Sequence, residues 1–244
     1  MANLPPSAAT SRTSFHKHLY LLIAVPVVLM ALALAVDNVV LSESVAFTCA
    51  AICLLVVLTT PNASRYLTFV MAAFLLSIVG DLFMISRASE LNFILGIAVF
   101  FLAHVCFLVY AFTKTKLAWP VAAVITIPFL VFYVVGLLPS PGLAGQTVLS
   151  SAALVYLLVS CVSCSVAVSG VVRAPRLPAR WVFAGGIASL MISDTFIAMG
   201  DFMKIASVWP FMMPLYYLAH ILITLSVTLE RMPVNETQVR AATD

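Results

Sequence analysis

The chain has 244 residues, of which 64% are hydrophobic and only 9% are charged. An average soluble domain carries about 25% charged residues, so this composition excludes a soluble globular protein and indicates an integral membrane protein. The formal net charge of +3 does not indicate a nucleic-acid partner, because the Lys and Arg residues lie scattered between apolar runs.

Apolar stretches long enough to cross a bilayer predict eight transmembrane helices, since about 20 residues span the hydrocarbon core. In chain order these stretches are 19–36, 42–60, 66–86, 91–112, 117–138, 147–172, 181–200 and 209–229. The first stretch is long enough to remain as a helix, so it is not read as a signal peptide. We expect a transmembrane domain at 19–231, flanked by polar tails at 1–18 and 232–244.

The positions of the basic residues predict how the helices are oriented. With eight spans, 10 of the 12 Lys and Arg residues fall at the end of the bundle that carries both termini. The other end holds only Arg87 and Lys204. Basic segments stay on the cytoplasmic side, so both termini are predicted to be cytoplasmic. The expected fold is therefore an all-α polytopic membrane protein. We expect it to be located in the cell (plasma) membrane.

Two features of the sequence occur once in each half of the chain. The stretch 100–104 reads FFLAH and the stretch 216–220 reads YYLAH, at an offset of 116 residues. The pair Asp81 and Asp194 has an offset of 113 residues. This similarity predicts two four-helix repeats, which insert with the same orientation because four spans return the chain to its starting side. Chance similarity between apolar helices is the alternative.

The predicted halves, about 19–114 and 117–231, each contain one aspartate within an apolar run. Asp81 lies in the third predicted helix and Asp194 in the seventh. A charged side chain at membrane depth costs at least roughly 2.5–3.5 kcal/mol, so it normally faces a protein interior or a wet cavity. The two aspartates are therefore the leading candidate functional residues, and the predicted symmetry brings them together at the bundle centre.

Other polar side chains at this depth are candidate substrate-binding or supporting residues, because lipid offers them no hydrogen-bond partners. They are Ser77, Asn92, His104, Ser193, Tyr216, Tyr217 and His220. Each can also be a packed residue with no chemical role. The two basic residues that follow the aspartates, Arg87 and Lys204, are candidate ligands for a lipid headgroup, with ordinary loop charge as the alternative. No metal site and no cofactor is predicted, since the helical zinc signature with two histidines is absent.

Four short motifs surround these residues. They are Gly80-Asp81, Phe93-x-x-Gly96-x-x-x-Phe100-x-x-Ala-His104, Ser193-Asp194 and Tyr217-x-Ala-His220. Over roughly residues 20–230 the chain resembles the YhhN/TMEM86 family. The resemblance implies a lysoplasmalogenase, a hydrolase that cleaves the vinyl ether bond of lysoplasmalogens, with Asp81 and Asp194 at the paired acidic positions. The chain departs from the family pattern at Thr60-Pro61, where relatives commonly carry Lys-Pro.

The implied reaction needs an acid that keeps its proton. Vinyl ethers hydrolyse after protonation of an alkene carbon, and burial of a carboxyl group favours its neutral form. The second carboxylate would then stabilise the cation and take a proton from water, as in glycoside hydrolysis. We expect Asp81→Asn and Asp194→Asn each to abolish hydrolysis. Two alternatives stay open, namely a proton-coupled transporter of a lipid or small molecule and a non-catalytic lipid-binding protein.

Overall fold

The computed structural model describes residues 39–59, 65–85 and 89–230, together with positions 24, 25, 27, 28 and 31. The predicted first span, 19–36, lies almost wholly outside the described residues. Both tails, Thr60-Pro61 and the proposed headgroup ligand Arg87 also lie outside them.

The described chain forms seven α-helices, and no strand occurs in it. The helices are α2 (Val39–Thr59), α3 (Leu67–Ile85), α4 (Glu90–Lys114), α5 (Trp119–Phe132), α6 (Thr147–Arg173), α7 (Pro178–Asp201) and α8 (Trp209–Leu229). Six spans are long and apolar enough to cross a membrane, formed by α3, α4, α6, α7, α8 and by α5 together with the π-helical turn that follows it. This confirms the prediction of a helical integral membrane protein. The prediction of eight spans extends beyond the described residues.

Proline residues mark several helix boundaries. α5, α7 and α8 each have a proline in their first two positions, where the missing N–H is not needed for an intrahelical hydrogen bond. α5 continues into a π-helical turn at Tyr133–Leu137. A segment rich in proline and glycine, 139–142, follows this turn and separates it from α6.

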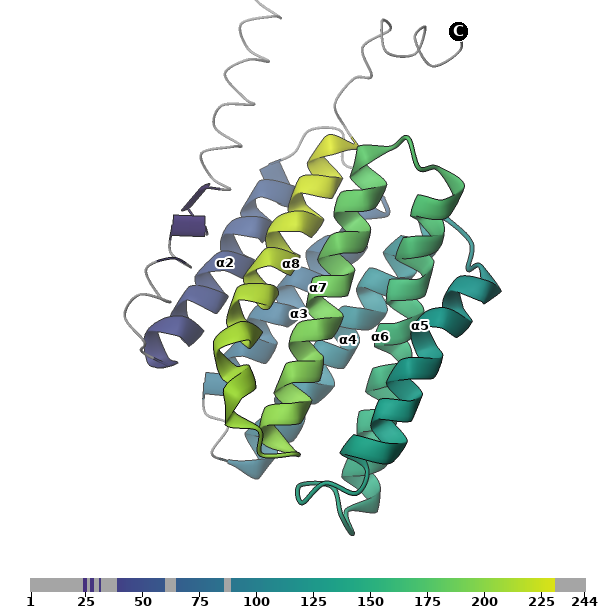
Figure 1. The fold of residues 1–244 in the computed structure, drawn as a ribbon. Helices are drawn as coiled ribbons and strands as arrows, with labels where there is room; N and C mark the ends of the chain where they lie inside the picture. Colours follow the sequence, from purple (N-terminus) through teal and green to yellow (C-terminus); the bar gives the residue numbers. More distant parts are fainter. Residues whose placement is uncertain are drawn as a thin grey trace, which may run out of the picture.

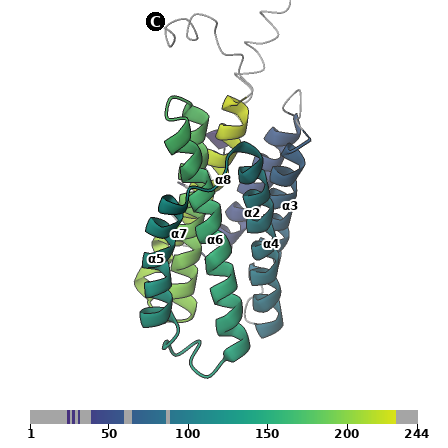
Figure 2. The same ribbon diagram turned by 90° about the vertical axis from the view of Figure 1, so that its right-hand side faces the viewer.

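Six helices form a closed ring in which each helix packs against two neighbours. The order around the ring is α2, α3, α4, α6, α7 and α8, and α8 packs back against α2. α5 lies outside this ring and packs against α6. Figure 1 shows α2 and α5 at opposite edges of the bundle, with α7 and α8 in front of α3 and α4. The turned view in Figure 2 also places these two pairs on opposite sides.

The helix contacts of the ring occur in matching pairs. α2 packs against α3 as α6 packs against α7, and α3 packs against α4 as α7 packs against α8. The two halves meet where α2 packs against α8 and where α6 packs against α4. If α2 is exchanged with α6, α3 with α7 and α4 with α8, every helix therefore keeps a neighbour of the corresponding kind on each side. A pseudo-two-fold axis along the ring centre would produce this arrangement.

The interior of the ring is apolar over most of its length. Phe74, Phe107 and Tyr217 are among its largest fully buried side chains. Titratable side chains interrupt this core in the middle of the bundle. His104 and His220 are 2% and 0% exposed there.

Candidate active site

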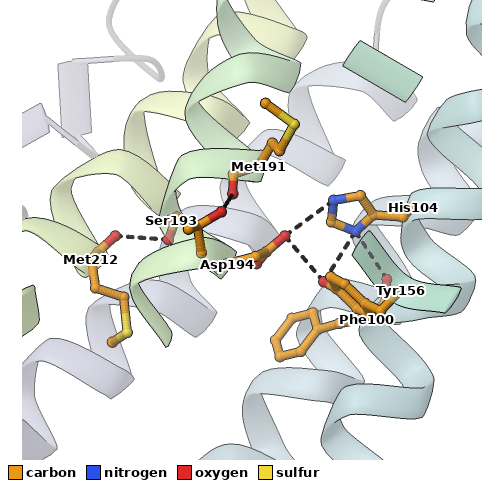
Figure 3. A network of polar contacts seen from close by, with 8 residues as sticks. Phe100, His104, Tyr156, Met191, Ser193, Asp194 and Met212 are labelled. Carbon is orange, nitrogen blue, oxygen red and sulfur yellow. Dashed lines mark hydrogen bonds and ion pairs between the residues drawn. The ribbon is translucent and has the colours of Figure 1, made fainter. Parts of the chain in front are cut away.

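Asp194 on α7 is the centre of a polar group contributed by three helices. Its Oδ2 lies 3.1 Å from Nε2 of His104 on α4 and accepts a hydrogen bond of 3.1 Å from the hydroxyl of Tyr156 on α6. The Tyr156 hydroxyl also lies 3.3 Å from His104 Nδ1. Figure 3 shows the Asp194 carboxyl group pointing toward both partners. The ring of helices thus brings a carboxyl, an imidazole and a phenol to one point.

The backbone of α4 fixes the proton arrangement of His104. Nδ1 of this ring lies 3.2 Å from the carbonyl oxygen of Phe100, one turn earlier on the helix. A carbonyl oxygen can only accept a hydrogen bond, so Nδ1 carries a hydrogen and Nε2 faces Asp194. His104 Nε2 and Asp194 Oδ2 lie 3.1 Å apart, although they form no hydrogen bond in this structure. A carboxyl group and an imidazole at this separation can exchange a proton, so the arrangement offers both a proton donor and a proton acceptor.

Asp81 on α3 is the centre of a second polar group, and it is 8% exposed. Its Oδ2 accepts a hydrogen bond of 3.0 Å from the hydroxyl of Tyr216 on α8, and the Ser77 side chain also interacts with this phenol. His220 stacks on Phe74 with ring centroids 5.3 Å apart, and its Nδ1 lies 2.9 Å from the Tyr216 carbonyl oxygen. The buried Nε2 of His220 has no hydrogen-bond partner among the described residues.

The two polar groups use corresponding helices. Asp81 reaches from α3 to α8, and Asp194 reaches from α7 to α4. Both histidines place Nδ1 against the carbonyl oxygen four residues earlier. The two polar groups differ at the residue that supplies this carbonyl oxygen. It is Tyr216 in the Asp81 group, which has a hydroxyl, and Phe100 in the Asp194 group, which has none. Asp194 receives its phenolic hydrogen bond from α6 instead.

The Phe100 ring packs next to the Asp81 group. It meets the Tyr216 ring edge-on, with centroids 6.1 Å apart. It also packs against Gly80, where a Cβ atom would approach Phe100 Cε1 to 2.9 Å. A residue without a side chain is needed at position 80, because this aromatic ring occupies the space beside it.

A cavity lies on the other side of Phe100, next to Asp194. It has a volume of about 90 Å³, and it forms part of a wider hollow of about 810 Å³ that includes open solvent. Its lining residues are mostly aliphatic or aromatic and come from α3 to α7, the π-helical turn and Phe202. The polar lining residues are Tyr156, Ser160, Asp194 and Thr195, whereas Asp81 is not part of the lining.

The remaining predicted site residues have different surroundings. Ser193 donates a hydrogen bond of 2.9 Å to the Met212 carbonyl oxygen, which ties α7 to α8 (Figure 3). Tyr217 is fully buried and Asn92 partly buried, and neither lines the cavity. Lys204 is exposed, two residues after the lining residue Phe202, and its φ of 60° is in the left-handed region.

Tyr156 is not among the site residues predicted from the sequence. A tyrosine in an apolar helix has the appearance of a packing residue, and this one belongs to neither of the repeated stretches. Among the described residues, no group of three or more His, Cys, Asp or Glu side chains is arranged to hold a metal ion.

A ring of membrane-crossing helices with a carboxyl–imidazole–phenol group beside an apolar cavity defines a polytopic membrane protein with an intramembrane polar site. The family model of the YhhN family matches residues 43–227, from within α2 to near the end of α8. The chain belongs to the YhhN family, which confirms the resemblance found in the sequence. No curated protein and no solved structure matches the chain.

Proposed function

We propose that this protein is a lysoplasmalogenase-like hydrolase, which cleaves the vinyl ether bond of a lysoplasmalogen to an aldehyde and a glycerophospholipid. The observation that carries this proposal is the position of Asp194, whose Oδ2 lies 3.1 Å from His104 Nε2 and which lines an apolar cavity. A proton donor beside an apolar cavity is what protonation of a vinyl ether requires. Membership of the YhhN family supports the same reaction class.

The first proposed step is proton transfer from the Asp194–His104 pair to the alkene carbon that is not bonded to oxygen. A C–H bond forms there, and the electron pair of the C=C bond makes it. The other alkene carbon and the ether oxygen then carry the positive charge of an oxocarbenium ion. The Asp194–His104 pair has lost its proton and is negative, so it stabilises the cation in a low-dielectric environment.

The second proposed step is addition of water to the charged carbon. The water loses a proton, which returns to the Asp194–His104 pair, and a hemiacetal forms. The hemiacetal then splits into the aldehyde and the free hydroxyl of the glycerophospholipid. Overall, substrate and water give the aldehyde and the glycerophospholipid. The Asp194–His104 pair ends with the same number of protons as at the start.

Asp81 has a different place in this proposal. The Phe100 ring lies against both Gly80 and the Tyr216 ring and also lines the cavity, whereas Asp81 does not line it. We therefore propose that Asp81 is a positioning residue, which acts on the cavity wall through Tyr216 and Phe100. Arg87 and Lys204 remain proposed ligands for the lipid headgroup, with Arg87 outside the described residues.

The eight-span topology with two parallel repeats and cytoplasmic termini is also part of the proposal. The matching helix contacts around the ring and the matching histidine–carbonyl contacts support two repeats of like orientation. Epitope tags at the two ends of the chain test the orientation in the cell membrane. Both tags should bind antibody only after the membrane is permeabilised, and labelling of either one on intact cells would contradict it.

The reaction itself is tested with purified protein in detergent. Three single-chain lipids are compared: a lysoplasmalogen, its saturated ether analogue and lysophosphatidylcholine. We expect aldehyde release from the vinyl ether lipid alone. A proton-coupled transporter or a non-catalytic lipid-binding protein would release aldehyde from none of them, and that result would contradict the proposal.

A further inference from the structure

The cavity wall contains a serine whose hydroxyl group has no protein partner. Ser160 on α6 lies one turn after Tyr156, lines the cavity and is 2% exposed. Its Oγ has no hydrogen bond to any of the described residues. Ser165 and Ser169, on the same helix, instead donate to the carbonyl oxygens four residues earlier, at 2.7 and 2.6 Å. Ser160, a residue of the cavity wall, therefore has a buried hydroxyl group that makes no hydrogen bond to the described protein.

One carboxyl oxygen of Asp194 also lacks a hydrogen bond. Its Oδ2 faces Tyr156 and His104, while no hydrogen bond to its Oδ1 is formed within the described part of the chain. The other polar lining residue, Thr195, donates its hydroxyl to the Met191 carbonyl oxygen at 2.8 Å. The unused hydrogen-bonding capacity of the described cavity wall thus belongs to Ser160 Oγ and Asp194 Oδ1.

Buried polar atoms in a membrane protein need partners, because lipid supplies none. A buried hydroxyl that stays unsatisfied costs about 1–3 kcal/mol. Water satisfies such atoms where at least two polar groups face a space of sufficient size. The cavity provides the space, and the serine hydroxyl and the carboxyl provide the two polar groups.

We propose that Ser160 and Asp194 bind the water molecule that hydrolyses the substrate, an inference that rests on the proposed function. Ser160 Oγ accepts one hydrogen of this water and Asp194 Oδ1 accepts the other, which leaves an oxygen lone pair for the cationic carbon. When the C–O bond forms, the water gives up the hydrogen that is bonded to Asp194 Oδ1, and this proton passes to the Asp194–His104 pair. The rest of the described cavity wall is largely apolar and offers water no comparable position.

The glycerol hydroxyl of the substrate offers the same hydrogen bonds as water. Enzyme kinetics distinguish between these two ligands of Ser160 and Asp194. A bound lipid hydroxyl contributes to substrate affinity, so its loss raises KM. A bound water acts only after the cation has formed, so its loss lowers kcat. The cation can also return its new proton to the Asp194–His104 pair, and this reversal becomes more frequent when capture by water is slow.

The test compares Ser160→Ala with Ser160→Thr and Ser163→Ala. Ser163 is the matched control, because it is 1% exposed, its hydroxyl also lacks a described partner, and it does not line the cavity. We expect Ser160→Ala to lower kcat about 10-fold without changing KM, the loss expected from one neutral hydrogen bond. Ser160→Thr should restore kcat, and Ser163→Ala should match the wild type.

Deuterium exchange gives a readout that a structural role of Ser160 would not change. In heavy water, reversal of the first step places deuterium on the alkene carbon of lysoplasmalogen recovered from the reaction. We expect more deuterium in lipid recovered from Ser160→Ala than from the wild type. An unchanged kcat, a raised KM, an equal loss in Ser163→Ala or no increase in deuterium would each overturn the water site.

A structure at high resolution separates this inference from the proposed function. Ordered water density within about 3 Å of both Ser160 Oγ and the Asp194 carboxyl is expected, since that is hydrogen-bonding distance. Absence of that density would overturn the water site even if the wild type releases aldehyde. A wild type that releases no aldehyde would instead contradict the proposed reaction.

Discussion

The two aspartate centres are built on corresponding helices, yet their carboxyl groups have different surroundings. Asp81 is bonded to the hydroxyl of Tyr216, next to which the Phe100 ring is packed. Asp194 accepts its phenolic hydrogen bond from Tyr156, because the residue that corresponds to Tyr216 is Phe100, and it borders a cavity. The cavity beside Asp194 does not have Asp81 in its lining. We propose that the neighbouring aromatic residues decide which of the two carboxyl groups a ligand reaches.

Asp194→Asn should have the largest effect. The amide keeps the size of the carboxyl group and can still accept the Tyr156 hydrogen bond, but it has no proton to transfer. We expect kcat to fall by about 10²–10⁴-fold, the usual contribution of general acid–base catalysis. Aldehyde release from lysoplasmalogen measures the loss, and the thermal unfolding midpoint in detergent checks that the variant folds. Activity near that of the wild type would show that Asp194 is not the acid.

Asp81→Asn should have a smaller effect. The amide oxygen can still accept the Tyr216 hydrogen bond, and the side chain at this position does not line the cavity. We expect the loss in kcat to stay below the roughly 10²-fold that marks direct proton transfer. This expectation replaces the equal losses expected from the sequence. The two aspartate variants are assayed side by side, and equal losses would remove the functional distinction between the centres.

Tyr156→Phe should reduce the activity of the Asp194 centre without abolishing it. The ring stays in place, while the carboxyl loses a hydrogen bond of 3.1 Å. A hydrogen bond to a charged group contributes about 1.5–3 kcal/mol, so a loss of roughly 10-fold or more in kcat is expected. Tyr133→Phe is the control, because its hydroxyl bonds the Ser150 carbonyl oxygen at 2.7 Å. Equal losses in these two variants would assign Tyr156 a structural role only.

Gly80→Ala should have a measurable effect on stability. Its Cβ would approach Phe100 Cε1 to 2.9 Å, so the aromatic ring must shift. Overpacking of this kind costs about 1–3 kcal/mol, which a lowered thermal unfolding midpoint would reveal. Gly185→Ala is the matched control, since its nearest neighbour is Leu222 Cδ1 at an ordinary 3.5 Å. Equal midpoints for the two variants would show that Phe100 is not held by Gly80.

Much of the fold could be predicted because the helices are continuous apolar runs between polar segments. The predicted stretch 66–86 became α3 at Leu67–Ile85, and 181–200 became α7 at Pro178–Asp201. The order of helices around the ring could not be predicted. These helices are apolar on nearly every side, so the sequence pattern does not indicate which face of a helix is directed inward.

The sequence singled out candidate site residues where an ionisable side chain lay within an apolar run. Asp194 and His104 satisfy that condition, and the structure places them 3.1 Å apart. Tyr156 was not predicted, because tyrosine is common in packed helices and its role depends on α6 lying between α4 and α7. Ser160 was not predicted for a related reason. α6 contains other serines that donate hydrogen bonds to the backbone of their own helix, and the sequence does not distinguish Ser160 from them.

The composition of the cavity wall has a consequence for what leaves it. Aldehydes form adducts with primary amines and thiols, and a product of that kind is a hazard to the protein that makes it. Among the described lining residues there is no lysine and no cysteine. If the proposed reaction takes place, an aldehyde formed beside Asp194 meets no lysine or cysteine on the described cavity wall that could trap it covalently.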